Sequence, residues 1–417
     1  MNSVAASRWT DGSMDARVRK RYAAERRFRL AGLLAVGLSV AFLAFLLITM
    51  AWSGIGGFTQ VQAKVAIDFP RSDLILDPAA LRGPQAREAV AAAGLEGVLS
   101  QAAVANYGPQ AEELFGAGGA DELADQLIAD PGLLERNAVL WIPVASRVGS
   151  AAKGDGTPEA ERMVAAIEAR DGLRRGFDWS FLENADATDP TAVGVWGALK
   201  GSFLTILVTI LLAFPIGVLA AVYLEEFAAR NRWTDAIEVS INNLAAVPSI
   251  IFGLLGLAVF LNFMHLPRSA PLVGGLTLAL MTMPVIVIAG RNAIKSVPPS
   301  IRDAALGFGA SKMQVVFQHV LPLALPGILT GTIIGLARAL GETAPLLMIG
   351  MRAFIATPPG GITDPATVLP VQIFLWSDEV DRAFVEKTSA AIIVLLVFML
   401  MMNGLAIYLR NRFERQW

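Results

Sequence analysis

The amino-acid sequence predicts an all-α polytopic membrane protein with six transmembrane helices and an α+β domain inserted between the first and second helices. Of its 417 residues, 54% are hydrophobic, and the mean hydropathy is +0.54. These values are high for a soluble domain and typical of a membrane protein. Each of six apolar segments approaches or exceeds the roughly 20 residues that cross a bilayer. They cover residues 30–50, 197–223, 239–261, 271–290, 323–350 and 389–409.

The first apolar segment, residues 30–50, follows a basic stretch that includes Arg26, Arg27 and Arg29. A cleaved signal peptide is the alternative interpretation. The apolar run is long for a signal peptide, and TMAWSGIGG lacks a clean small-x-small cleavage site. We therefore expect residues 1–51 to form a cytoplasmic basic tail and an uncleaved transmembrane anchor.

Residues 52–195, the inserted domain, contain charges of both signs, Pro and Gly, and no run long enough to span a membrane. Residues 84–108 and 157–176 have the apolar spacing of helices. KVAIDF at 64–69 and AVLWIPVAS at 138–146 are expected to be short strands. These patterns predict an α+β domain on the outer, extracytoplasmic side of the membrane, followed by a transmembrane domain at 196–417.

Basic residues on short loops predict that both termini are cytoplasmic. Cytoplasmic loops of membrane proteins are enriched in Lys and Arg. With the N-terminus inside, the inner loops and tail carry Arg230, Arg232, Arg291, Lys295, Arg302, Lys312, Arg410, Arg412 and Arg415. The outer loops carry only Arg268, Arg352, Arg382 and Lys387. The bias predicts a multi-pass membrane protein with both ends inside.

Composition argues against several kinds of chemistry. The chain has no cysteine, which excludes thiol catalysis and disulfides. Its histidines are His265 and His319, too few for a histidine metal site. No GxxxxGK[ST] phosphate loop is present, so we expect no ATPase activity. The acidic residues of the inserted domain have the pattern of a solvated helix face rather than a metal site: Asp121, Glu122 and Asp125.

The polar segment 291–322 after the fourth apolar segment is the most informative stretch. A helix is expected to begin at Ser300, after two prolines, with Asp303 favourably placed in its first turn. Gly309 relaxes the backbone where a second helix turns away. Alone, this pattern fits either a docking loop or an ordinary loop with helix breakers. The candidate coupling residues, in a loop at about 298–322, are Asp303, Ala304, Ala305, Gly309, Leu321 and Pro322.

This spacing resembles the EAA loop of ABC importer permeases, which that family uses to dock on a nucleotide-binding subunit. Asp303 stands where the family usually has Glu, and His319 where it usually has an aliphatic residue. The segments FPIGVLAAVYLEEFA, INNLAAVPSIIFGLLGLAVF, ARALGETAPLL and LPVQIFLW resemble PstA-type permeases of phosphate ABC transporters. The resemblance covers about 196–417 and implies a type I ABC importer permease core. The anchor and inserted domain resemble the N-terminal extension of some bacterial members.

The resemblance implies an importer of inorganic phosphate in the bacterial inner membrane, built from several subunits, with the inserted domain of this chain in the periplasm. The implied partners are a PstC-type permease, a PstB-type ATPase dimer, a PstS-type periplasmic phosphate-binding protein and a PhoU-type regulator. ATP and Mg²⁺ would bind to the partner ATPase, and this chain would bind no cofactor. Two alternatives stay open: a permease for sulfate or molybdate, and a membrane sensor that uses the inserted domain.

Arg338 and Glu342, four residues apart in the fifth apolar segment, are the main candidates for the translocation path. An ionised group inside a span costs about 2.5–3.5 kcal/mol on insertion scales, so it is expected to face water or a partner. On one helix face the two charges can pair. Arg338 can bind phosphate oxygens with two parallel hydrogen bonds, or the pair can serve packing alone. Arg291, at the cytoplasmic end of the fourth segment, is a path candidate or an ordinary interfacial Arg.

Four further residues in the apolar segments or at their ends have competing interpretations. Pro345 is either a flexing point or a packing kink beyond the charged pair. Trp376 is either part of a gate or an interfacial anchor. Glu225 and Glu226 either contact the ATPase or the N-terminal helix or, as we expect, lie at a solvated helix end.

Overall fold

The structure is a computed structural model that describes residues 13–72, 74, 76–83, 86–351 and 354–413. The predicted loop residues Arg352 and Arg415 lie outside these ranges. The chain divides into two compact units, residues 1–53 and 54–417. The first unit consists of most of α1 (Ser13–Ile55), which is long and apolar enough to cross a membrane.

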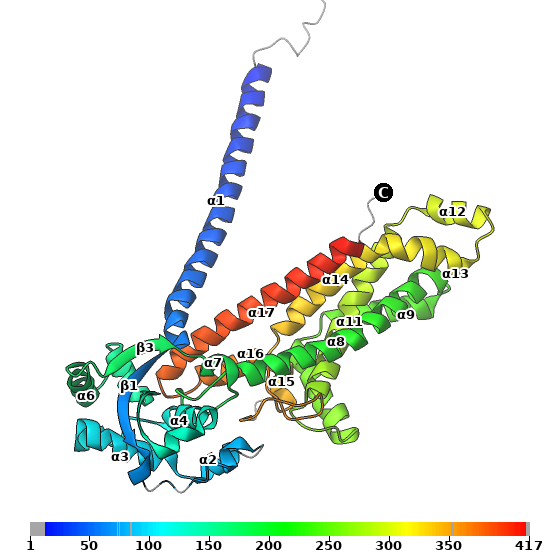
Figure 1. The fold of residues 1–417 in the computed structure, drawn as a ribbon. Coiled ribbons are helices and arrows are strands. Elements are labelled where there is room, and N and C mark those ends of the chain that lie inside the picture. Colours follow the sequence, from blue (N-terminus) through cyan, green and yellow to red (C-terminus); the bar gives the residue numbers. More distant parts are fainter. Residues whose placement is uncertain (1–12, 73, 75, 84–85, 352–353, 414–417) are drawn as a thin grey trace, which may run out of the picture. The chain divides into compact units, whose positions relative to one another are not determined.

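In the second unit, four more helices are long and apolar enough to cross a membrane. Figure 1 shows these helices, and two of them are extended by π-helical turns. They are α8 (Trp196–Val222) with η6 (Tyr223–Phe227), α11 (Pro271–Lys295), η8 (Val315–Val320) with α14 (Leu321–Leu340), and α17 (Ala383–Phe413). The predicted set of spans is therefore found, except for the segment at 239–261.

The segment at 239–261 is not one straight helix. It is divided between α9 (Arg232–Ala245) and α10 (Ser249–Gly256), which continues as η7 (Leu257–Phe263). The two parts are bent by 101°. Pro248 lies at the break, has no N–H to donate, and disfavours a helical conformation in the residue before it. The described residues therefore contain five possible spans, or six if the bent pair is one span.

The predicted segment 323–350 is also interrupted. α14 ends at Leu340, and a separate short helix, α15 (Ala344–Met348), follows. Pro345 lies in the first turn of α15, where the missing N–H has no intrahelical partner to lose. Pro345 therefore helps to begin a helix rather than kinking one. The chain then continues through α16 (Leu369–Ser377) into α17.

The inserted domain contains a small antiparallel sheet in the order β2-β1-β3. β1 (Thr59–Asp68) and β2 (Asn137–Pro143) confirm the two predicted strands. The helical pattern predicted over 157–176 holds only for Pro158–Glu168; its end is instead the strand β3 (Leu173–Phe177), which was missed because LRRGF has no apolar alternation. The helices here are α2 (Ala86–Ala92), α3 (Leu95–Tyr107), α4 (Ala117–Ala129), α5 (Ser146–Ala152), α6 (Pro158–Glu168) and α7 (Ser180–Glu183). The 3-10 turns are η1 (Gly56–Phe58), η2 (Phe69–Arg71), η3 (Ala80–Arg82), η4 (Pro109–Ala111) and η5 (Pro131–Glu135).

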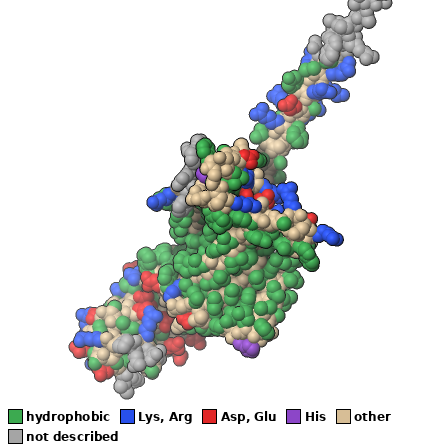
Figure 2. Space-filling view, turned by 90° about the vertical axis from the view of Figure 1, so that its right-hand side faces the viewer, with side chains coloured by type: hydrophobic (Ala, Val, Ile, Leu, Met, Phe, Trp, Pro, Cys, Tyr) green, Lys and Arg blue, Asp and Glu red, His purple; other side chains and the backbone are tan. Residues whose placement is uncertain are grey.

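One hydrophobic core continues from the inserted domain into the helices. It contains Phe181 and Val193 together with Val273 and Leu346, all at most 2% exposed. The domain boundaries therefore stay predictions, because packing does not stop at residue 195. Figure 2 shows a broad hydrophobic surface on the helices of the second unit, with most visible charges in the regions on either side of it.

Candidate translocation and coupling site

Arg338 and Glu342 pair, as predicted, but not on one helical face. Arg338 lies in the last turn of α14, where the helix dipole favours a cation, and Glu342 lies beyond the helix end. Arg338 Nε donates to Glu342 Oε1 at 3.3 Å. The Arg338 side chain is 52% exposed and that of Glu342 is 17% exposed. Among the described residues, Arg338 has no other hydrogen-bond partner, so most of its N–H groups are unpaired within the described part of the chain.

Close packing of α14 on α11 fixes the position of this pair. A Cβ atom on Gly331 would lie 2.1 Å from the Cβ of Ala289, so only glycine permits this approach. One turn further on, Gly335 faces Thr282 in the same way, at 3.0 Å. The tight contact places the end of α14 rigidly, and α17 packs on another side of α14.

At the opposite end of α11, Arg291 is held by two carboxylates. Its Nη2 donates to Glu238 at 2.8 Å, and its Nε to Glu225 at 3.4 Å. Lys295 lies 3.6 Å from the same Glu225. The Arg291 side chain is 12% exposed, so its charge is compensated inside the chain. Its role on the translocation path stays a prediction.

Arg302, in α12 (Pro299–Gly307), makes the densest set of polar contacts in this region. Its Nε and Nη2 donate to Glu226 Oε1 at 3.0 and 2.7 Å. Its Nη1 and Nη2 also donate to the carbonyls of Val297 and Ile294, at 2.7 and 2.9 Å, at the end of α11. Arg302 therefore joins α12 to both η6 and α11.

The prediction of a solvated helix end for Glu225 and Glu226 is wrong. Their side chains are 14% and 10% exposed and are paired with Arg291, Lys295 and Arg302. Both lie in the π-helical turn η6, an irregularity that is frequent at functional sites. The signal in the sequence was an adjacent acidic pair with three basic residues on the facing loop. We call these residues the loop junction: Glu225, Glu226, Glu238, Arg291, Lys295 and Arg302.

The predicted coupling loop presents an exposed surface. α12 begins at Pro299, one residue before the predicted Ser300, so Asp303 lies beyond its first turn and that part of the prediction is wrong. Asp303 and Ala304 are exposed. Gly309 has φ of +83°, a conformation that other residues rarely adopt, which confirms the predicted bend. Phe308 is 94% exposed beside it.

The return of this loop to the membrane is more buried. After α13 (Lys312–Gln314), the chain enters η8, where His319 is exposed. Leu321 and Pro322 are half-buried at the start of α14, and Ala305 is half-buried in α12. The exposed apolar side chains of the loop are Leu306, Phe308, Met313 and Phe317. Exposed apolar side chains of this kind fit an interaction surface, and the coupling role of the loop stays a prediction.

Near the inserted domain, Trp376 is buried rather than interfacial. It is 3% exposed, and its Nε1 donates to Asp186 Oδ1 at 3.0 Å. Burial raises the pKa of Asp186, and the hydrogen bond from Trp376 partly offsets this rise. The anchor interpretation of Trp376 is therefore wrong, and its role in a gate stays a prediction.

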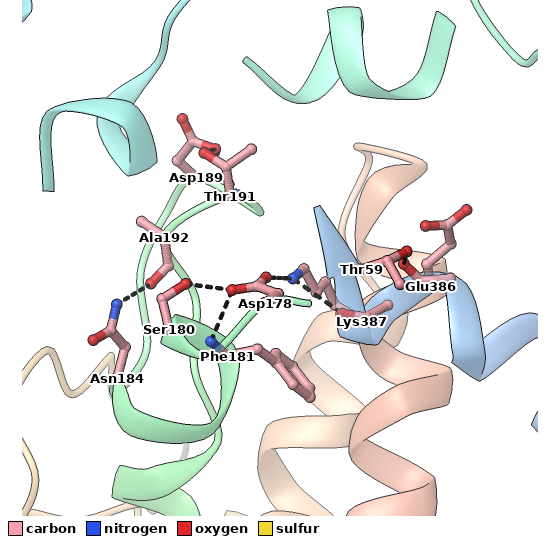
Figure 3. Close-up of polar contacts among 12 residues, drawn as sticks. Thr59, Asp178, Ser180, Phe181, Asn184, Asp189, Thr191, Ala192, Glu386 and Lys387 are labelled. Atoms are coloured by element: carbon pink, nitrogen blue, oxygen red, sulfur yellow. Dashed lines mark hydrogen bonds and ion pairs between the residues drawn. The ribbon is translucent and has the colours of Figure 1, made fainter. Parts of the chain in front are cut away.

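Lys387 does not lie on an outer loop as predicted. It lies inside α17, is 8% exposed, and pairs with Asp178 of the inserted domain (Figure 3). The charge count had placed it on a loop because the apolar run begins two residues later. We call the contacts of Asp178, Lys387, Lys153 and Glu386 the insert junction.

The acidic residues of α4 have separate surroundings. Asp125 pairs with Arg87 at 2.9 Å, Glu122 accepts from Gln126, and burial raises the pKa of Asp121. Asp121 and Asp125 line a cavity of about 790 Å³ that also contains Asp186. This acidic lining does not suit an anion such as phosphate.

Comparison with known proteins identifies the class of protein. Residues 198–415 match the family described as binding-protein-dependent transport system inner membrane component. The chain belongs to this family, whose members are transporter permease subunits and not enzymes. Residues 15–162 match a domain of unknown function, DUF3333.

The relatives include the type predicted from the sequence. The chain is 31% identical over 228 residues to the phosphate transport system permease protein PstA of Yersinia pestis, covering 54% of this chain and 75% of the relative. It is 33% identical over 210 residues to PstA of Haemophilus influenzae, covering 50% and 73%. The predicted resemblance to PstA-type permeases is confirmed. Among solved structures, the MetNI methionine ABC transporter matches with a TM-score of 0.42 at 20% identity, over 53% of this chain and 95% of that chain.

Proposed function

We propose that the chain is a permease subunit of an ABC importer that moves inorganic phosphate into the cytoplasm. The observation that carries the proposal is Arg338, half-exposed at the end of α14 in a family whose relatives include PstA permeases. A guanidinium can hold two phosphate oxygens at once. Glu342 orients Arg338 and keeps the site from holding the anion too tightly for release.

Arg291 is a weaker candidate for the path than Arg338. Its place at the end of α11 supports a role at the cytoplasmic exit. Its two carboxylate partners, however, already compensate its charge and reduce its attraction for an anion. The proposed order along the path is therefore Arg338 with Glu342 first, and Arg291 last.

The proposed assembly contains a PstC-type permease, a PstB-type ATPase dimer, a PstS-type binding protein and a PhoU-type regulator. ATP and Mg²⁺ would be bound and used by the ATPase dimer. The excess of basic residues on the loop-junction side supports an orientation with both termini in the cytoplasm and the inserted domain outside. The exposed apolar patch around Phe308 would then face the ATPase.

In the proposed mechanism, ATP binding closes the ATPase dimer and moves α12. Arg302 carries this motion to η6 and α11, because it contacts both. The transmembrane core then exchanges access between its two sides, and phosphate passes Arg338. Phosphate itself shifts this equilibrium only through its different affinity for the two states.

The test is uptake of radiolabelled phosphate in a strain that lacks its own phosphate importer, comparing wild type with Arg338→Gln. We expect the variant to lose at least tenfold in uptake with unchanged membrane level and ATPase association. Arg268→Gln, at an exposed loop residue, is the matched control and should retain uptake. Unchanged uptake in Arg338→Gln would mean that Arg338 and Glu342 serve helix packing alone. Uptake of sulfate or molybdate, but not phosphate, by wild type would favour the other oxyanion, and uptake of none would favour the sensor.

A further inference from the structure

The inserted domain meets α17 through an ion pair that is almost completely buried. Lys387 Nζ lies 2.5 Å from Asp178 Oδ2, and the two side chains are 9% and 1% exposed (Figure 3). Lys387 also donates to the Gly57 carbonyl at 3.2 Å and lies 4.8 Å from the centre of the Phe181 ring. Every one of these Lys387 contacts is with the inserted domain.

Asp178 is held equally firmly from its own side. Its Oδ1 accepts from Ser180 Oγ at 2.5 Å and from the Phe181 N–H at 3.1 Å. Its backbone N–H donates to the Phe58 carbonyl at 2.8 Å. A buried ion pair with all partners satisfied adds little net stability over an apolar pair, but losing one partner is costly. The pair therefore defines where α17 sits on the inserted domain more than it stabilises the fold.

Close packing surrounds the pair. A Cβ atom on Gly57 would lie 2.4 Å from the carbonyl oxygen of Glu386, so the backbone of η1 lies directly against α17. Phe181 packs near Trp376 of α16, with ring centres 6.3 Å apart, and Trp376 near Phe384 of α17, at 6.1 Å. Rings from the domain and from both helices thus form one cluster.

Two further polar contacts connect the same parts. Lys153, after α5, pairs with Glu386 of α17 and also donates to the Gly56 carbonyl at 3.0 Å. Asp186 accepts from Trp376 of α16 at 3.0 Å. The inserted domain therefore holds α16 once and α17 twice through polar side chains. A domain that hinged or undocked to report a signal would have to break all three contacts.

We propose that the inserted domain is a rigid strut that positions α16 and α17 during transport, with Asp178–Lys387 as the positioning pair. α17 packs on α14, the helix that carries Arg338. One packed layer therefore separates the strut from the path residue. This inference rests on the proposed transport function and assigns a role to a domain outside the matched permease family.

The decisive test covalently cross-links the inserted domain to α17 at the insert junction. The chain has no cysteine, so Lys153→Cys with Glu386→Cys introduces the only two thiols. Both native side chains are partly exposed, at 23% and 38%, which gives a bifunctional methanethiosulfonate reagent access. In the assembled complex we expect uptake after cross-linking to stay within twofold of the untreated double variant. Glu386→Cys alone, treated with the same reagent, is the control for the chemistry.

A loss of uptake of tenfold or more after cross-linking, absent in the control, would overturn the strut, because the junction would then have to open. If untreated protein takes up no phosphate, the proposed function fails separately. In that case, ATP hydrolysis by the assembled complex is measured before and after cross-linking instead of uptake. A change within twofold supports the strut, and a loss of tenfold or more overturns it.

A second test removes the Asp178–Lys387 pair instead of cross-linking the junction. Lys387→Met leaves Asp178 buried without its cation, and we expect a tenfold or greater fall in maximal uptake with an unchanged KM for phosphate. Adding Asp178→Asn, which keeps an acceptor for Ser180, should restore uptake to within threefold of wild type. Full uptake in Lys387→Met would overturn the positioning role. If that variant does not assemble, the cross-linking result decides alone.

Discussion

The insert junction and the loop junction both attach a polar part of the chain to the ends of apolar helices. They differ in how many charged partners each residue has. At the insert junction, Lys387 has one carboxylate partner and is sealed from water. At the loop junction, Glu225 is shared by Arg291 and Lys295, while Arg291 is shared by Glu225 and Glu238. A single buried pair specifies one arrangement, whereas shared partners allow several. The difference assigns rigidity to the insert side and rearrangement to the loop side.

The backbone supports the same distinction. The loop junction contains the π-helical turn η6 and is followed by a second one, η8, and by a left-handed residue at Gly309. Lys387 lies in a regular part of α17. Irregular turns give the loop side local freedom that the start of α17 lacks.

The largest expected effect at the loop junction follows Arg302→Gln. It removes the charged contact with Glu226 and the contacts with two carbonyls, leaving a carboxylate that is 10% exposed without its cation. Breaking a pair this buried costs about 3 kcal/mol. We expect ATP hydrolysis to continue while phosphate uptake falls at least tenfold, measured as ATP used per phosphate in vesicles containing the complex.

Arg302→Lys is the matched control, since it keeps the charge but loses the planar fork. An intermediate ratio of ATP to phosphate is expected for it. Tight coupling in Arg302→Gln would show that the exposed face of α12, rather than its contacts with η6 and α11, transmits the motion.

Gly309→Leu should have the next largest effect. A Cβ atom at Gly309 would have no neighbouring atom within 4 Å, but φ of +83° costs a non-glycine residue about 1–2 kcal/mol. We expect uncoupled ATP hydrolysis with a folded permease. Gly307→Leu, at a position whose Cβ would be equally free and whose φ is ordinary, should remain more tightly coupled. Coupled transport at the wild-type rate in Gly309→Leu would reject the docking role of the loop.

Arg291→Gln tests whether the shared charge partners at the loop junction compensate the loss of one cation. Lys295 remains 3.6 Å from Glu225, so the network keeps one cation after Arg291 is lost. We expect about 1 kcal/mol of lost stability and less than a threefold fall in uptake, because Lys295 still compensates the buried Glu225 and the other partner, Glu238, is 38% exposed. Thermal unfolding and uptake of the same preparation measure both. A loss of uptake equal to that of Arg338→Gln, at normal stability, would place Arg291 on the path.

The sequence predicted most helices and the bend at Gly309, because apolar runs, Pro and Gly act locally. The prolines before residue 300 were correctly interpreted as the start of a new helix. Pro248 lies inside an apolar run, and the helix break at this proline was not predicted. Lys387 was misplaced because counting charges along a chain cannot show that a residue of the inserted domain lies beside it. The role of Arg302 depends on three elements that meet only in the folded chain.

The smallest expected effect concerns Asp186, at the edge of the insert junction. Burial and the nearby Glu379 raise the pKa of this carboxyl above its usual 3.8, so the folded chain binds the proton more tightly than the unfolded chain does. Stability from this group is therefore present at low pH and lost as pH rises through the raised pKa. Asp186→Asn keeps an acceptor for Trp376 and removes the charge. We expect equal stability near pH 4 and a gain of below about 1 kcal/mol at pH 7, seen in thermal unfolding at both pH values. A loss at pH 7 would mean that the ionised carboxylate itself holds Trp376, and that the attachment of α16 to the inserted domain depends on this charge.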